Sequence, residues 1–187
     1  DGRRLMFEEE GVVVVTFGST LQQHWRQRLP ESCTAPAAWA GGDTVVWQDA
    51  GFRPRRLLKL DLQAGDGKPR VLLERGELRM LAVSPDDTQV ACATAQRFVS
   101  EGPVMHDLEI VDVRSGAVTR RAASEGHAIE AAVWPLPDVI LLCSMEGHRE
   151  VGFTWLDTGS VRLVRVSPRT GRTRRLRWGA TMSVGQR

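Results

Sequence analysis

The sequence predicts an all-β fold built from repeated four-stranded antiparallel units, and three observations carry this prediction. Apolar residues alternate or run briefly between turn signals, as in VVVVTF at 12–17, and helical periodicity is nearly absent. One hairpin pattern recurs along the chain, and a second strand-turn-strand pattern follows each copy of it. The 187 residues are 42% hydrophobic and 26% charged, which is the ordinary composition of a folded domain.

The first repeated pattern is a hairpin with an aspartate in its turn. Glycine, proline and aspartate favour tight turns between the two apolar runs. The adjacent carboxylates Asp86 and Asp87 are therefore interpreted as turn residues, because a catalytic carboxylate pair needs a concave and partly dehydrated site. The three copies are APAAWAGGDTVVWQD at 35–49, MLAVSPDDTQVACAT at 80–94 and EAAVWPLPDVILLCSM at 130–145, with turn aspartates Asp43, Asp87 and Asp138 spaced 44 and 51 residues apart.

The second pattern is a strand, a polar turn and another strand. It reads LLKLDLQAGDGKPRVLLE at 57–74, LEIVDVRSGAVTRRAA at 108–123 and VRLVRVSPRTGRTRRLRW at 161–178. We match Asp61, Asp112 and Arg165, which are 51 and 53 residues apart. VVVVTFGSTLQQHWRQRLP fits the same pattern, with Thr16 at the matched position.

Two patterns in phase indicate one domain, 1–187, made of repeats. We expect a partial repeat at 1–30, whole repeats at 31–76, 77–123 and 124–178, and a closing or edge strand at 179–187. Four-stranded repeats of this length are the blade signature of β-propellers. The sequence therefore predicts a β-propeller or partial propeller of about three and a half blades. We expect an open arc that lacks upstream blades, or at most a ring of four blades.

The chain resembles the WD-repeat and WD-like propeller families in SPDD at 84–87, DG at 1–2, IVDVRSG at 110–116 and GHAIEAAVW at 126–134. The resemblance implies that Gly126-His127 opens a blade, that Asp138 is a turn aspartate and that Asp112 ends a third strand. Leu60 and Val111 stand where the WD family has tryptophan. This departure favours the looser propellers of translocation-assisting periplasmic proteins and of some serine peptidases.

Catalytic, cofactor-binding and metal-binding patterns are not expected in this chain. His24, His106, His127 and His148 lack the spacing that would place two metal ligands on one face. We interpret His148 as a loop residue. No GxSxG nucleophile elbow occurs, and GDGK at 65–68 lacks the spacing of a phosphate-binding loop. We therefore expect no catalytic residue, no cofactor, no metal and no enzymatic activity.

The three cysteines, Cys33, Cys92 and Cys143, have no CxxC spacing. Cys92 and Cys143 each follow a turn aspartate by five positions, which predicts the same strand position in neighbouring repeats. One blade apart, they would lie beyond the reach of a disulfide of about 7 Å. We expect both thiols to be unpaired and buried. Unpaired thiols favour a cytoplasmic location, while an extracytoplasmic, membrane-anchored propeller stays open as the alternative.

Arginine is concentrated toward the end of the chain. Residues 162–187 hold eight arginines and no acidic residue, whereas the net charge of the whole chain is only +2. One hypothesis is a basic patch that binds a partner. The alternative is an exposed edge strand kept soluble by its charge. Nucleic acid and membrane lack a clear signal, because Trp178 is the single aromatic residue in this stretch and no apolar run has the length of a membrane span. The candidate patch consists of Arg169, Arg172, Arg174, Arg175 and Arg177.

The resemblance implies a non-enzymatic scaffold that binds a protein or peptide partner through its loops. Two alternatives stay open: a propeller domain accessory to a serine hydrolase or peptidase, and an extracytoplasmic ligand-binding sensor. If the arc is open, we expect self-association through strand edges, the first of them within residues 1–17.

Overall fold

The structure is a computed structural model of the 187-residue chain. It describes residues 4–8, 12–17, 23–28, 33–41, 43–49, 54–61, 68–95, 107–123, 128–145, 148–151, 154–157 and 161–176. Every regular element in these ranges is a β-strand, and no helix there is long and apolar enough to span a membrane. The predicted all-β class is confirmed.

The first sheet has three antiparallel strands in the order β1-β2-β3. Leu5 pairs with Val15, and Val15 pairs with Arg26, so the strands follow one another as a simple meander. β2 contacts β4 of the next sheet, just as β6 contacts β8. The three strands therefore correspond to the second, third and fourth strands of a complete blade. The strands are β1 (Arg4–Glu8), β2 (Val12–Phe17) and β3 (Gln23–Arg28).

Three complete sheets follow, each with four antiparallel strands in simple order. The second sheet contains β4 (Cys33–Trp39), β5 (Thr44–Asp49), β6 (Arg55–Asp61) and β7 (Arg70–Arg75). The third contains β8 (Glu77–Val83), β9 (Gln89–Ala95), β10 (Asp107–Asp112) and β11 (Val118–Ala123). The fourth contains β12 (Ala128–Leu136), β13 (Val139–Met145), β16 (Val161–Val166) and β17 (Thr173–Leu176).

A separate hairpin interrupts the fourth sheet between β13 and β16. It consists of β14 (His148–Val151) and β15 (Thr154–Asp157), which pair antiparallel. His148 pairs with Asp157 in this hairpin. The expectation that His148 lies in a loop is therefore wrong, because HREV and TWLD form a local strand pair.

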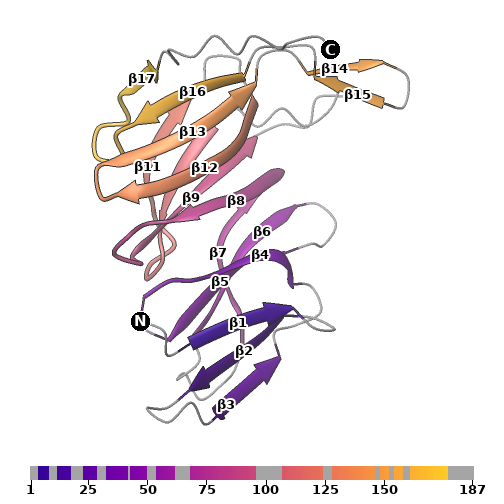
Figure 1. The fold of residues 1–187 in the computed structure, drawn as a ribbon, viewed down its shortest axis with the longest axis vertical. Helices are drawn as coiled ribbons and strands as arrows, with labels where there is room; N and C mark the ends of the chain where they lie inside the picture. Colours follow the sequence, from indigo (N-terminus) through magenta and orange to yellow (C-terminus); the bar gives the residue numbers. More distant parts are fainter. Residues whose placement is uncertain are drawn as a thin grey trace, which may run out of the picture.

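The sheets pack face to face in chain order (Figure 1). Alternate residues of one strand face opposite neighbours, as the two-residue period of a strand requires. In β9, Val90 and Cys92 join a buried cluster with the second sheet, whereas Ala91 and Ala93 join another with the fourth. Successive sheets that share apolar layers in this way are the packing of propeller blades.

The described part of the chain forms an open row of sheets. Figure 1 shows the first sheet at one end of the longest axis and the fourth at the other. The partial propeller predicted from the sequence is thus observed as an arc. The closing or edge strand expected at 179–187 lies outside the described residues.

Candidate functional site

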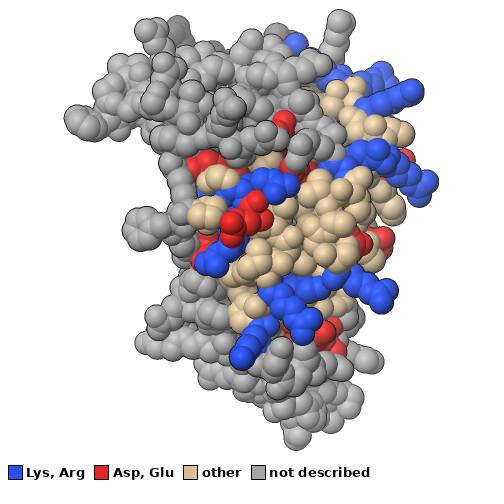
Figure 2. Space-filling view, turned by 180° about the vertical axis from the view of Figure 1, so that it is seen from behind, with Lys and Arg blue, Asp and Glu red and all other residues tan. Residues whose placement is uncertain are grey.

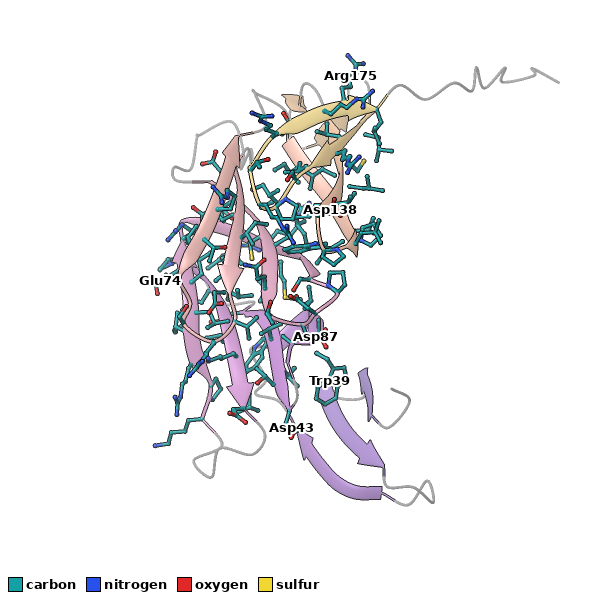
Figure 3. The ribbon with its side chains drawn as sticks, turned by 90° about the vertical axis from the view of Figure 1, so that its left-hand side faces the viewer. Trp39, Asp43, Glu74, Asp87, Asp138 and Arg175 are labelled. Carbon is teal, nitrogen blue, oxygen red and sulfur yellow. The ribbon has the colours of Figure 1, made fainter. Side chains whose placement is uncertain are left out.

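Most of the residues that recur at matched positions of the sequence repeats lie at one end of the sheets. In an antiparallel sheet, the turn after the first strand and the turn after the third lie at the same end. Asp43, Asp87 and Asp138 lie in the β4–β5, β8–β9 and β12–β13 turns, while Asp61 and Asp112 end β6 and β10. Figure 3 shows the three turn aspartates following one another along one side of the molecule. We call this end of the second to fourth sheets the turn face.

Asp86, rather than Asp87, holds the β8–β9 turn together. Oδ1 of Asp86 accepts hydrogen bonds from the Ser84 hydroxyl at 2.6 Å, the Thr88 hydroxyl at 3.0 Å and the Thr88 amide at 3.3 Å. The hydrogen bond from Ser84 is the largest cause that lowers the pKa of Asp86. Asp87 has a φ of 58°, a left-handed conformation that aspartate tolerates. Both aspartates are exposed, as turn residues are.

Asp112 organises the β10–β11 turn in the same way. Its Oδ1 accepts hydrogen bonds from the amide of Ser115 at 2.7 Å and from its hydroxyl at 2.6 Å. These contacts, led by that of the hydroxyl, lower the pKa of Asp112. Gly116 closes the turn with a φ of 75°.

The geometry of the β16–β17 turn shows that Arg165 is not the equivalent of Asp112, contrary to the prediction from the sequence. Gly171 has a φ of 70° and its amide donates to the Ser167 carbonyl, as the amide of Gly116 donates to the Asp112 carbonyl. Ser167 is therefore the equivalent of Asp112, and it lies two residues beyond Arg165. Arg165 instead lies within β16, where its Nη2 is 3.8 Å from Oδ2 of Asp138.

The cysteines show the same kind of shift. Both are free, as expected, but Cys143 is only half-buried whereas Cys92 is fully buried. Val111 pairs with Val90, and its equivalent Val166 pairs with Ile140, so Leu142 is the equivalent of Cys92. The predicted equivalence of Cys92 and Cys143 is wrong. The β12–β13 turn is shorter than the β8–β9 turn, and a shift of one residue moves a side chain to the other face.

A groove of about 380 Å³ opens on the turn face between the third and fourth sheets. The third sheet contributes polar side chains from the β8–β9 turn, β9 and β11. The fourth contributes residues from its two turns, including Pro137 and Pro168. Gln89 Nε2 lies 3.4 Å from Thr119 Oγ1, which in turn donates to the carbonyl of Ile110 at 3.1 Å. The charged and polar lining residues are Asp86, Thr88, Gln89, Thr119, Arg120 and Arg169.

The candidate basic patch lies next to this groove. Arg169 lines it from the β16–β17 turn, and Arg172, Arg174 and Arg175 are exposed in the stretch that follows. Figure 2 shows Lys and Arg side chains in several groups along the described face, one of them at the end that holds the fourth sheet, and Figure 3 places Arg175 beyond Asp138 at that end. Arg177 and His127 lie outside the described residues. The structure thus brings Arg169 to a groove that the sequence did not indicate.

Toward the opposite end of the sheets lie ion pairs between partly exposed arginines and buried carboxylates, which sequence reasoning missed. Arg75 Nη2 lies 3.0 Å from Oε2 of Glu109, whose side chain is 1% exposed. Arg55 Nε lies 3.2 Å from Oε2 of Glu77, whose side chain is 3% exposed. Each pair joins the second sheet to the third. The signal in the sequence is a charged residue within or beside an apolar strand, as in ELRML and LEIVD.

Two of the aspartates on the turn face have a structural role in their turns. Asp86 and Asp112 accept hydrogen bonds within their own turns, and those bonds lower the pKa of each carboxyl, whereas a general acid needs a raised or matched pKa. Within the part of the chain that the structure describes, no three His, Cys, Asp or Glu side chains gather as metal ligands would. What the turn face offers is a polar groove bordered by arginines.

No protein-family model matches the sequence, and no curated protein matches it. Solved structures do match the fold. A putative TolB from Agrobacterium tumefaciens superposes with a TM-score of 0.64 at 17% identity, over 96% of this chain and 60% of that one. Hydrazine synthase from Kuenenia stuttgartiensis gives 0.62 at 14% identity, over 94% and 51%.

The β-propeller domain of the Trilobed protease from Pyrococcus furiosus, described as having an open velcro topology, gives a TM-score of 0.55 at 14% identity, over 92% and 57%. The chain thus spans about 60% or less of each of these three proteins. At these identities the likeness shows the fold alone. The chain has a β-propeller fold.

Proposed function

We propose that the chain is a non-enzymatic scaffold of the WD-like propeller type, which binds a protein or peptide through its turn face. The observation that carries this proposal is the groove between the third and fourth sheets. Binding sites are concave and place a few polar groups precisely. Here the groove combines two prolines with hydroxyl, amide and guanidinium groups from two separate sheets.

The rigidity of the surrounding sheets supports the proposal. Lys59 Nζ donates to the carbonyls of Val113 and Arg114, both at 2.8 Å, and so fixes the β10–β11 turn against the second sheet. The β8–β9 turn is fixed by the hydrogen bonds of Asp86 and Ser84. The side chains of this site lie on strands and on turns that hydrogen bonds hold in place. Binding a ligand therefore costs little conformational entropy, which favours affinity.

A second candidate function follows from the likeness to a protease propeller. In this reading the chain is a propeller segment accessory to a serine peptidase, and its sheets would guide access to a catalytic domain. The sequence encoded on either side of this chain would distinguish the two candidate functions. A nucleophile elbow with its histidine in the flanking sequence would favour the peptidase, since this sequence contains no GxSxG.

Selection from a phage-displayed peptide library on the immobilised chain tests the scaffold proposal. Selected peptides are then measured by fluorescence polarisation against the chain and against Thr119→Trp. Thr119 is exposed on β11 and lines the groove, so a tryptophan there fills the space without disturbing the core. We expect affinity to fall at least about tenfold, which is about 1.4 kcal/mol.

Val71→Trp is the matched control, because Val71 is an exposed residue of β7 and does not line the groove. Peptides should bind this variant as they bind the unmodified chain. A library that yields no binding peptide, or peptides that bind Thr119→Trp as well as Val71→Trp, would refute the turn face as a binding site.

A further inference from the structure

We propose that the groove on the turn face recognises an acidic peptide, with carboxylate groups held between Arg120 and Arg169. This inference rests on the proposed function and names the chemistry of the partner. Arg120 comes from β11 of the third sheet and Arg169 from the β16–β17 turn of the fourth. An anion between them therefore contacts both sheets.

The two guanidinium groups are available to a ligand. Among the residues that the structure describes, neither Arg120 nor Arg169 has an ion-pair partner, and both are exposed. A guanidinium presents a planar set of donors that matches a carboxylate with two parallel hydrogen bonds. Carboxylates are thus the peptide groups that these two side chains recognise best.

The negative charge in the groove is already engaged by the protein. Asp86 is the acidic residue among the described residues of the lining, and its Oδ1 accepts three hydrogen bonds from Ser84 and Thr88. The described part of the lining holds two arginines and one aspartate, which gives that part a positive charge. Charge complementarity therefore favours an acidic ligand over a basic one.

The rest of the lining favours a peptide over nucleic acid. Thr88, Gln89 and Thr119 provide hydroxyl and amide groups that can pair with a peptide backbone. None of the described residues that line the groove is aromatic, so among them bases would find no ring to stack on. Pro137 and Pro168 form apolar walls without an amide donor, which suit the methylene groups of an extended acidic side chain.

Positive charge continues beyond the groove along the fourth sheet. Arg172, Arg174 and Arg175 are exposed after the turn that carries Arg169, and residues 162–187 contain no Asp or Glu. Arg174 lies directly opposite Arg165 in the β16–β17 pair, a like-charge arrangement that disfavours the isolated sheet. An acidic segment that crosses the groove and continues over β17 would neutralise this charge.

Fluorescence polarisation of three labelled probes tests the proposal on the 187-residue chain. The probes are a peptide of alternating Glu and Gly, the same peptide with Gln in place of Glu, and single-stranded oligothymidine of similar length. We expect the Glu peptide to bind at least about tenfold more tightly than the Gln peptide, and added salt to weaken it. The variants Arg120→Glu and Arg169→Glu should each weaken it by about fivefold or more.

Arg70→Glu is the control, because it makes the same charge change at an exposed position of β7 outside the groove. Equal binding of the Glu and Gln peptides, or equal loss in Arg70→Glu and Arg120→Glu, overturns the acidic-peptide proposal. Tighter binding of oligothymidine than of the Glu peptide also overturns it, in favour of nucleic acid. Peptides from the library that depend on Thr119 but are not acidic would overturn this inference alone and leave the scaffold proposal standing.

Discussion

Gly116 shows how one residue can fix the contact between two sheets. Its φ of 75° lies in the left-handed region, and a Cβ at this position would stand 2.7 Å from the carbonyl oxygen of Leu72 in β7. Gly41 has a similar φ of 64°, but its Cβ would stand 3.3 Å from the carbonyl oxygen of Asp87. The two glycines therefore share the backbone requirement and differ in the closeness of the neighbouring sheet.

We predict that Gly116→Ala lowers the free energy of unfolding by about 3 kcal/mol and Gly41→Ala by about 1 kcal/mol. Both variants force alanine into a left-handed conformation, and only Gly116→Ala also pushes a backbone carbonyl of the next sheet away. Urea denaturation followed by tryptophan fluorescence gives both values. Equal losses in the two variants would show that the contact with Leu72 has no separate cost.

At the scale of elements, the second and third sheets are joined by apolar layers and by ion pairs. Cys92 lies fully buried in the apolar layer, and burial raises the pKa of its thiol far above the usual value. Arg75 and Glu109 bridge the same two sheets at 3.0 Å. Loss of the arginine from such a pair is costly, because the Glu109 carboxylate is buried and stays away from water.

We predict that Arg75→Met destabilises the chain by about 3 kcal/mol, since it removes the guanidinium from a carboxylate that is 1% exposed. The matched control is Arg165→Met, because the pair of Arg165 with Asp138 is 3.8 Å long and both side chains are about half exposed. That control should change stability by less than about 1 kcal/mol. Similar losses for the two variants in urea denaturation would contradict the assigned role of the Arg75–Glu109 pair.

At the scale of the whole molecule, the described sheets form a row with two outer ends. In the first sheet, β1 occupies the edge where a complete blade has its innermost strand. In the fourth, β17 is the edge strand and carries exposed arginines. Charged side chains discourage pairing with another chain at a strand edge. The sequence of β1, RLMFE, contains fewer arginines than the stretch around β17.

We predict that the isolated 187-residue chain self-associates in a concentration-dependent manner. Unpaired strand edges offer hydrogen-bonding groups to a second chain, and a row of sheets leaves such edges open. Size-exclusion chromatography with light scattering at several protein concentrations provides the measurement. A monomer at every concentration would mean that the edges are closed, and the arc would then be wrong as a description of the protein in solution.

Local chemistry explains how much of the fold the sequence determined. Strand periods, turn residues and their recurrence placed the three hairpin turns at Asp43, Asp87 and Asp138, where the structure has them. These features depend on residues that are neighbours in the chain, because a turn is closed by groups a few positions apart. The four-stranded repeat depends on the same local signals, so the sequence by itself predicts the all-β propeller architecture.

Only the tertiary structure determines which residues of different sheets are equivalent and which residues come together in the groove. The short β12–β13 turn places Leu142 where Cys143 was expected, and the hydrogen bonds of the β16–β17 turn place Ser167 where Arg165 was expected. Arg120 and Arg169 meet at one groove only because two sheets pack side by side. Such contacts join residues far apart in sequence, and their geometry depends on how whole sheets twist and stack. No short stretch of sequence carries that information, so the sequence indicates the cluster of arginines but not the groove.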